Sequence, residues 1–455
     1  MSPEHGVAPG RVDALLEAEI ARFEQTHPRS GRTNERARAT MPRGVPLHWM
    51  ANWPTPYPVC LAEASGATLT DVDGNTYADF CLGDTGAMFG HANPVVAEAV
   101  AEQVRRGSTT MLPTEDAVVV GEELARRFGL PYWQLATSAT DANRFAIRIA
   151  RIATGREKVL VFNGKYHGSV DETQVSLRNG RMMPQPGVAP NAVDWARTTK
   201  VVEFNDVPAL ERALADEDVA CVLAEPVMTN VGVVPAEAGY HDALRDLTRR
   251  TGTLLIIDET HTISTGPGGY TRAHGLDPDL FVLGKSIAGG IPAAVYGMTT
   301  DVAEAFLRYT AKDDYRISHG GFGGTLVGNA LTLRALRTTL GEVMTDDAYR
   351  HMGALAEQFD TGVAQVIADH RLPWHVTRLG ARVEYLFSAR APHNGGEAKQ
   401  FRVPRLEAAI HLYLLNRGVL LTPFHNMALM CPATSESDVD LHTGVFADCV
   451  KELVP

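Results

Sequence analysis

The sequence predicts an α/β protein: a mostly parallel central sheet with helices on both faces, and a smaller α+β domain made from both ends of the chain. Short apolar runs at residues 159–162, 219–223, 254–258 and 280–283 are separated by segments of helical periodicity. Continuous apolar strands are typical of parallel sheets that are buried on both faces. At 455 residues the chain is also longer than one ordinary domain.

Changes in pattern along the chain predict the domain boundaries. Alternation of helices with apolar runs begins near residue 95 and ends near residue 338. We therefore expect residues 1–95 to form the N-terminal part of a small domain. Residues 96–338 would form a large cofactor-binding domain, and residues 339–455 the C-terminal part of the small domain.

The individual elements follow from periodicity and turn signals. Residues 11–25 have helical spacing of apolar side chains, and an Asp-Gly pair between alternating runs at residues 68–77 predicts a β-hairpin. Further helices are expected at residues 94–105, 115–128, 140–153, 240–250, 349–368 and 406–416, and further strands at 201–204 and 381–387.

Composition excludes several classes of function. The net charge of −12 argues against nucleic acid or an anionic membrane as a partner. The five cysteines are odd in number and form no CxxC pair, so neither a disulfide framework nor a zinc or other metal site is expected. The sequence has no signal-peptide pattern and no apolar stretch of about 18 residues, so we expect a cytoplasmic protein.

Two ionisable residues close two of the predicted strands. Asp258 ends one apolar run, and Lys285 follows another after Gly284. Parallel sheets of this kind bind ligands beyond the carboxyl ends of their strands. A lysine there can form a Schiff base with pyridoxal 5′-phosphate (PLP), and an aspartate can pair with the cofactor's pyridinium nitrogen.

With these residues in place, the chain resembles the class III PLP-dependent aminotransferases of fold type I. The nearest subgroup contains the glutamate-1-semialdehyde aminomutase-like and β-amino-acid aminotransferase-like proteins. The resemblance covers about residues 36–440, and its motifs occur in family order. They are Asp71-Val72-Asp73-Gly74-Asn75, Gly90-His91, Thr137-Ser138-Ala139-Thr140-Asp141-Ala142-Asn143, Tyr166-His167-Gly168, Glu225-Pro226, Ile257-Asp258-Glu259, Leu283-Gly284-Lys285 and Thr325-Leu326-Val327-Gly328-Asn329.

The resemblance implies the catalytic pair and the phosphate site. Lys285 would bind the cofactor aldehyde and later move the proton, while Asp258 keeps the ring nitrogen protonated. Glu259 points to the other side of the chain and is expected to be structural. The segment Ser138-Ala139-Thr140 opens a helix whose free amides and hydroxyls can hold the phosphate, although a plain helix cap is compatible with the same residues. The family usually has glycine in place of Ala139.

Four further positions complete the implied cofactor site. Tyr166 would stack on the cofactor ring, and His167 would shape the same turn. Glu225 would lie near Lys285 and the cofactor hydroxyl. Thr325 matches the residue that reaches the phosphate of the neighbouring subunit, which implies a homodimer with shared active sites.

The sequence departs from the family after Asp258-Glu259, where Val and then Gln or Met are common. Here Thr260 would place a hydroxyl on one ring face. We hypothesise that His261 hydrogen-bonds the cofactor O3′ oxygen, and a histidine bonded to loop backbone is the alternative.

On the substrate side, residues 44–49 lack the arginine of the aminomutase pattern, and residues 422–426 lack the one found in β-amino-acid enzymes. Arg382, Arg402 and Arg405 are the candidate replacements. Trp49 and Trp53 suggest an apolar or aromatic substrate pocket.

The predicted function is a ping-pong aminotransferase that takes an amino group from a donor amine or amino acid and gives it to an oxo acid or ketone. The alternative on the same scaffold is an aminomutase or an amino-acid racemase. A catalytically silent binding protein with this fold is a third class, and the intact Lys285 and Asp258 argue against it.

Overall fold

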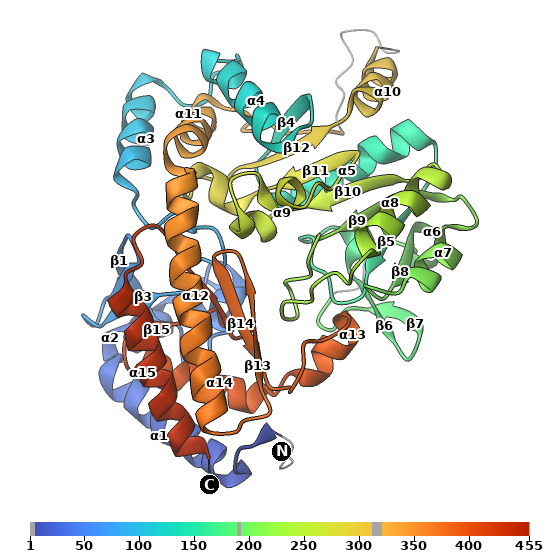
Figure 1. The fold of residues 1–455 in the computed structure, drawn as a ribbon. Helices are drawn as coiled ribbons and strands as arrows, with labels where there is room; N and C mark the ends of the chain where they lie inside the picture. The colour runs from blue at the N-terminus through green and yellow to red at the C-terminus, as the bar shows by residue number, and fades with distance from the viewer. Residues whose placement is uncertain (1–4, 189–192, 312–320, 455) are drawn as a thin grey trace. The chain divides into compact units, whose positions relative to one another are not determined.

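The computed structural model describes residues 5–188, 193–311 and 321–454 (Figure 1). The chain divides into two compact units, each built from segments distant in sequence. The smaller unit comprises Met1–Asn93, Asp347–Ala391 and Phe401–Pro455, and the larger comprises Pro94–Asp346 and Pro392–Gln400.

The larger unit is built on a seven-stranded sheet. Its strand order is β4 (Tyr132–Ala136), β12 (Ala294–Met298), β11 (Leu280–Leu283), β10 (Leu254–Asp258), β9 (Val219–Ala224), β5 (Lys158–Phe162) and β8 (Thr199–Val202). The strands from β11 to β8 are parallel, whereas β12 runs antiparallel to both β11 and β4. The prediction of a mostly parallel sheet is therefore confirmed.

Alternate side chains of these strands enter two separate cores. One core packs Val161, Leu223 and Ile256 against helix α5 (Ala139–Thr154). The opposite core packs Leu160, Val222 and other residues against α7 (Val207–Leu214) and α8 (Tyr240–Arg250), which lie on one side of the sheet in Figure 1. Burying one such aliphatic side chain contributes about 1.5–3 kcal/mol, so both faces need helical cover.

Most of the predicted elements of the larger unit are present. Helices α4 (Glu115–Phe128) and α8 have the predicted bounds, and α3 spans Pro94–Arg106. Strand β8 lies earlier than the predicted 201–204, because the chain turns after Val202 and Asn205 has a left-handed φ of 64°. Among the residues described in this unit, two further helices of eight residues or more are α10 (Thr300–Thr310) and α11 (Ala330–Thr338).

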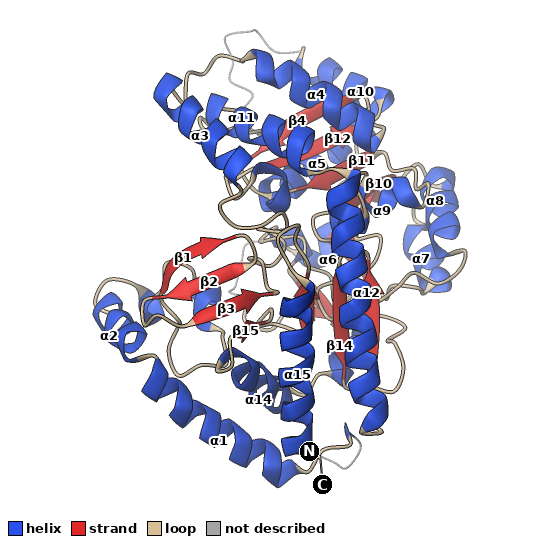
Figure 2. Cartoon of the chain, turned by 60° about the vertical axis from the view of Figure 1, so that its left-hand side comes forward, coloured by secondary structure: helices blue, strands red, loops and turns tan. Residues whose placement is uncertain are grey.

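The smaller unit contains one mixed sheet, in which β15 runs parallel to β3, one antiparallel sheet, and long helices (Figure 2). One sheet has the order β1 (Leu61–Ser65), β2 (Thr68–Asp71), β3 (Thr76–Asp79), β15 (Val419–Leu420), and the other the order β13 (His375–Leu379), β14 (Arg382–Leu386), β16 (Met427–Leu429). The helices are α1 (Pro9–Thr26), α2 (Pro28–Ala37), α12 (Asp346–Asp369), α14 (Pro404–Leu415) and α15 (Glu436–Leu453). The predicted Asp-Gly hairpin is β2–β3, whereas α2 and β1 were not predicted.

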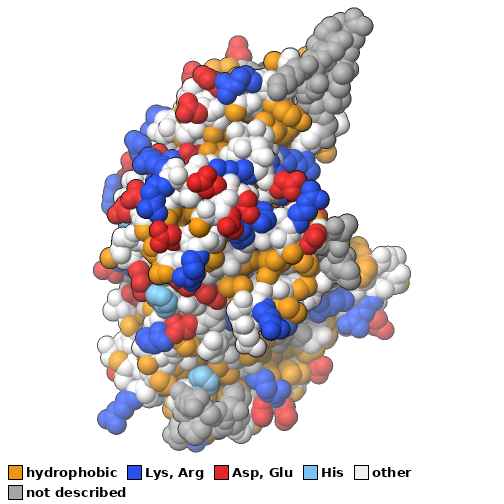
Figure 3. All heavy atoms as spheres, turned by 90° about the vertical axis from the view of Figure 1, so that its right-hand side faces the viewer, with side chains coloured by type: hydrophobic (Ala, Val, Ile, Leu, Met, Phe, Trp, Pro, Cys, Tyr) orange, Lys and Arg blue, Asp and Glu red, His pale blue; other side chains and the backbone are white. Residues whose placement is uncertain are grey.

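Charges of both signs are interspersed on the face drawn in Figure 3, with apolar side chains between them. Among the helices of the described residues, none combines the length and the apolar character needed to span a membrane.

Candidate active site

Asp258 and Lys285 lie at the same edge of the large sheet. Asp258 is the last residue of β10 and pairs with Val282 of β11, whose last residue is Leu283. Gly284 and then Lys285 follow directly. The parallel pairing of the two strands therefore delivers both side chains to the carboxyl edge, where the sequence predicted a site.

Asp258 is held by donors on both carboxylate oxygens. Asn143 Nδ2 and His167 Nδ1 donate to Oδ2 at 2.8 and 2.9 Å. The backbone amide and the hydroxyl of Thr260 donate to Oδ1 at 3.1 and 2.6 Å. The Thr260 hydroxyl thus binds the aspartate, and its expected place on one cofactor ring face stays a prediction. With four donors around it, the carboxylate has a fixed orientation.

These donors keep Asp258 ionised although it is only 4% exposed. Burial on its own raises the pKa of this carboxyl. The hydrogen bond and positive charge of His167, together with the bonds from Thr260 and Asn143, outweigh burial and lower the pKa to about 2. Asp258 is therefore an anion at neutral pH and is suited to face a protonated ring nitrogen.

Three buried polar atoms near this carboxylate have no hydrogen-bond partner within the described residues. They are Asn143 Oδ1, His167 Nε2 and Glu225 Oε1. The other oxygen of Glu225 accepts from the amide and hydroxyl of Thr229 at 3.0 and 2.6 Å. Burial raises the pKa of Glu225, and the charge of His167 opposes that rise. Leaving buried polar atoms unpaired is costly, so these atoms indicate groups that a ligand would complete.

Glu259, the neighbour of Asp258, is fully buried and saturated. It accepts from the Thr262 hydroxyl and from the amides of Tyr270 and Thr271. Burial raises its pKa against these hydrogen bonds. A side chain at Gly269 would meet this carboxyl at 2.8 Å, which leaves no space for a ligand there. The contacts agree with a structural role for Glu259.

Helix α5 begins near the same edge. Ser138 is its N-cap, and the Ser138 hydroxyl accepts from the Asp141 amide at 3.2 Å. The Thr140 hydroxyl accepts from the Ser169 amide at 3.3 Å. Both residues are half-buried, so the helix end carries amides and hydroxyls at an accessible position suited to a phosphate.

Ala139, which replaces the family's usual glycine, packs against Gly284. A side chain added at Gly284 would lie 3.0 Å from the Ala139 methyl group. The methyl of Ala139 thus occupies space left by Gly284, next to Lys285. The substitution is compensated within the chain, and it joins the helix end to the lysine-bearing strand.

The Lys285 amine meets a histidine. Lys285 Nζ lies 2.8 Å from His261 Nε2, and both side chains are half-buried. His261 was predicted to bind a cofactor oxygen, and that role stays a prediction. Tyr166 lies half-buried in the segment after β5, next to His167, and its predicted stacking also stays a prediction.

Thr325 is exposed and lines a hollow of about 270 Å³ together with Thr137, Asp141 and Phe145 of its own chain. It therefore lies beside the start of α5 in the same unit. Its predicted contact with a neighbouring subunit is not tested by these contacts.

The predicted substrate residues belong to the smaller unit. Trp49 packs edge-on against Phe424 with 5.7 Å between ring centroids, and Trp53 is half-buried.

The three candidate arginines of the smaller unit have different partners. Arg402 pairs with Glu407 and Arg405 with Asp13. Arg382 is fully buried and donates to the Thr85 hydroxyl at 2.6 Å. Two of the three arginines therefore face carboxylates of the chain itself.

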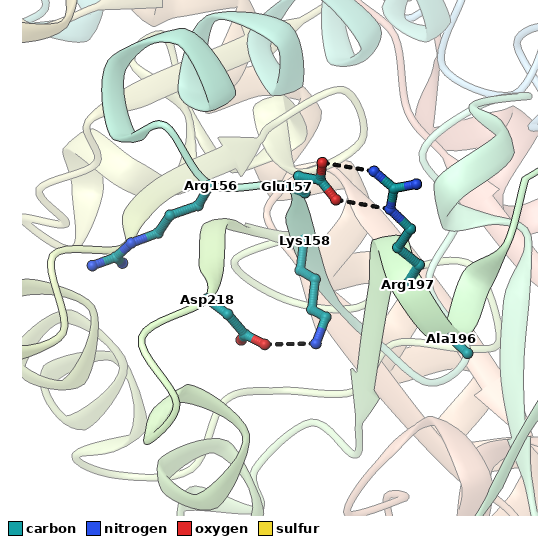
Figure 4. Close-up of a pocket in the computed structure, with 6 residues that line it drawn as sticks. All are labelled: Arg156, Glu157, Lys158, Ala196, Arg197 and Asp218. Atoms are coloured by element: carbon teal, nitrogen blue, oxygen red, sulfur yellow. Dashed lines mark hydrogen bonds and ion pairs between the residues drawn. The ribbon is translucent and has the colours of Figure 1, made fainter.

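A second hollow, of about 410 Å³, lies at the opposite, amino edge of the large sheet (Figure 4). Arg197 grips Glu157 through two hydrogen bonds of 2.8 and 3.0 Å, and Lys158 pairs with Asp218 at 2.5 Å. These charges neutralise each other across a partly exposed surface. Asp218 Oδ1 is also a buried oxygen without a hydrogen bond among the described residues, but it lies 2.7 Å from Lys200 Nζ in an ion pair, so the carboxylate at the amino edge is matched by lysines of the chain itself.

The residues at the carboxyl edge fit a PLP-like group. Asp258 suits a ring nitrogen, Lys285 an aldehyde, and the start of α5 a phosphate. The bare oxygen of Glu225 suits a ring hydroxyl. The sequence analysis gave Asn143 no role beyond its place in a motif and expected Thr260 at a ring face, so it missed both as partners of Asp258. The available signal for Asn143 was a polar residue on the apolar face of a predicted helix.

Comparison with known proteins identifies the family. The sequence model described as "Aminotransferase class-III" matches residues 49–449. The chain therefore belongs to the class III aminotransferase family. It is also similar to a glutamate-1-semialdehyde 2,1-aminomutase of Thermomicrobium roseum, with 35% identity over 84% of this chain and 88% of that protein.

Solved structures agree with this fold. A glutamate-1-semialdehyde-aminomutase from Pseudomonas aeruginosa PAO1 is 60% identical, with a TM-score of 0.97, covering 98% of this chain and 99% of that one. A variant of that enzyme, in which a lysine is replaced by alanine, is described in complex with PMP. An omega-transaminase from Sphaerobacter thermophilus is 28% identical with a TM-score of 0.85, covering 93% of this chain and 97% of that one.

Proposed function

We propose that this chain is a PLP-dependent aminomutase, which moves an amino group within one substrate molecule. The observation that carries the proposal is the 60% identity, over 98% of the chain, to the Pseudomonas aeruginosa aminomutase. This proposal replaces ping-pong transamination as the leading function, because the Thermomicrobium roseum relative described above is also named an aminomutase. The cytoplasmic location expected from the sequence is kept as part of the proposal.

The cofactor is pyridoxal 5′-phosphate, whose aldehyde and electron-withdrawing ring stabilise negative charge on a carbon next to nitrogen. Lys285 would hold the aldehyde through its Nζ atom. Once released by the substrate amine, the same Nζ would be the group that moves a proton at the substrate carbon. Asp258, an anion at neutral pH, holds the ring nitrogen in its protonated form.

The remaining side chains orient these two residues. His167, Asn143 and Thr260 fix the direction of the Asp258 carboxylate through the four hydrogen bonds described above. Ser138 and the first amides of α5 bind the phosphate, where the helix dipole favours negative charge. Glu225 Oε1 binds the cofactor's ring hydroxyl.

The site belongs to a homodimer in this proposal, with Thr325 reaching the phosphate bound by the second copy. Exposed apolar side chains in the same unit support a partner of this kind: Met111 is 76% exposed, Leu112 71% and Leu326 59%. Sedimentation of wild type and Met111→Asp tests it. We expect a dimer for the wild type and a larger monomer fraction for the variant, and a monomeric wild type would contradict the shared site.

Transamination is the second candidate. It is favoured by the segment from Gly44 to Trp49, which lacks the arginine of the aminomutase pattern, and by the similarity to an omega-transaminase. A substrate bound without that arginine would be less acidic than the substrate of the aminomutases.

One-substrate turnover separates the candidates. The purified enzyme with bound PLP is mixed with excess glutamate-1-semialdehyde and then with a panel of amino aldehydes and β-amino acids, with no oxo acceptor. An aminomutase turns over many times and gives an isomer of the same mass in which the amino group has moved. A transaminase stops after one equivalent per site, with the cofactor left as pyridoxamine phosphate. A racemase changes only the configuration.

A further inference from the structure

The side chain of His261 contacts the atom on which the proposed chemistry depends. Its Nε2 lies 2.8 Å from Lys285 Nζ. His261 comes three residues after the end of β10, and Lys285 comes two residues after the end of β11. The contact therefore bridges two neighbouring parallel strands at the carboxyl edge of the sheet.

His261 is placed by a short rigid turn. The turn starts at Asp258, whose carboxylate accepts both hydrogen bonds from Thr260. The Ile263 amide donates to the Glu259 carbonyl at 2.9 Å, and a 3₁₀ helix (Thr262–Thr265) follows directly. One turn thus fixes both Asp258 and His261, so the orientation of the imidazole is coupled to that of the buried carboxylate.

Lys285 is fixed from the other side. Its φ of 56° lies in the left-handed region, which is unfavourable for a residue with a side chain. The next three residues, Ser286, Ile287 and Ala288, are buried. Packing therefore holds the lysine backbone in one conformation, while the side chain has four rotatable bonds through which the amine can change its position.

We propose that His261 is a positioning residue for Lys285. Nε2 accepts a hydrogen bond from Nζ whenever the amine is not bonded to the cofactor, and this bond limits the amine to the orientation from which it captures the aldehyde. The inference rests on the proposed function. Capture forms a C–N bond between neutral Nζ and the aldehyde carbon, and the aldehyde oxygen leaves as water with both hydrogens of the amine.

Three variants separate positioning from packing. His261→Gln keeps an acceptor oxygen near the place of Nε2. His261→Leu keeps bulk without an acceptor, and His261→Asn has an acceptor too short to reach Nζ. If His261 positions Lys285, the His261→Gln variant should keep the rate of PLP capture that His261→Leu and His261→Asn both lose. If His261 only fills space, Leu behaves like wild type.

The readout is the rate at which the full-length protein, stripped of cofactor, captures added PLP. Capture is followed by the visible absorption band and confirmed by borohydride trapping and peptide mapping of Lys285. We expect Leu and Asn to slow capture about tenfold and Gln to stay within about threefold. With substrate, kcat should fall in parallel with little change in KM.

Wild-type capture rates in His261→Leu or His261→Asn would overturn the inference, as would a Gln variant as slow as Leu with an unchanged thermal midpoint. If one variant fails to fold, the remaining pair still decides. The capture rate is measured without substrate, so failure here is distinct from failure of the aminomutase proposal.

Discussion

The two edges of the large sheet carry similar residue types in different states. At the amino edge, Lys158 and Asp218 pair at 2.5 Å, and their side chains are 27% and 34% exposed. At the carboxyl edge, Asp258 is buried, and atoms of His167 and Glu225 have no partner among the described residues. The difference shows that charged residues alone do not mark a site. At the carboxyl edge the signal is the buried anion Asp258 together with the partnerless polar atoms clustered around it.

Replacing one lysine at each edge should give the largest difference in turnover between the two edges. Lys285→Ala should lower turnover at least about 10³-fold, because the covalent anchor and the proton carrier are both lost. Lys158→Ala, the matched control, should stay within about twofold. Steady-state rates and borohydride labelling with peptide mapping measure both. If Lys285→Ala kept full activity and borohydride labelled another residue, Lys285 would not be the residue that binds the cofactor aldehyde.

Asp258→Asn tests the buried anion. The amide keeps the shape of the side chain but cannot hold a ring nitrogen protonated, so kcat should fall about 10²-fold or more. The visible spectrum of bound PLP should shift as well. An unchanged kcat would mean that another group carries this charge.

The same variant has a defined effect on stability. The folded-state pKa of Asp258, about 2, is below the unfolded value of about 3.9. The ionised carboxylate therefore stabilises the fold above about pH 4, by about 2 kcal/mol, and this contribution is lost as the pH falls toward 2. Urea unfolding should show a gap between wild type and Asp258→Asn at pH 6 that narrows at pH 3. A constant gap would contradict the low pKa.

Gly284→Ala examines how the carboxyl edge is packed. The new methyl would lie 3.0 Å from that of Ala139 and 3.4 Å from that of Ala294, and overpacking of this kind costs about 1–3 kcal/mol. The double variant with Ala139→Gly should recover a large part of this loss. Thermal unfolding of the two single variants and the double variant measures the coupling, and strictly additive effects would show that the two positions do not compensate.

The sequence was sufficient for the strands and for Asp258 and Lys285, because continuous apolar runs set where each parallel strand ends. It was insufficient for the partners of Asp258. Asn143 comes from α5 and His167 from the segment after β5, and their meeting depends on how helix and strand pack together. The contact between His261 and Lys285 was missed for the same reason. Helix α2 was missed because its polar composition gives no apolar periodicity.

The amino edge supplies the smallest expected effect. Asp218 accepts ion pairs from Lys158 and from Lys200, whose distances are 2.5 and 2.7 Å. Burial raises the pKa of Asp218, and the two lysines lower it further than burial raises it. Since the carboxylate is one-third exposed, water and salt screen both pairs, and Asp218→Asn should cost at most about 1 kcal/mol. The loss should shrink in 0.5 M salt, while turnover and PLP capture stay at wild-type values. If Asp218→Asn instead lowered turnover as Asp258→Asn does, the hollow of Figure 4 would belong to the working site, and the contrast between the two edges would no longer hold.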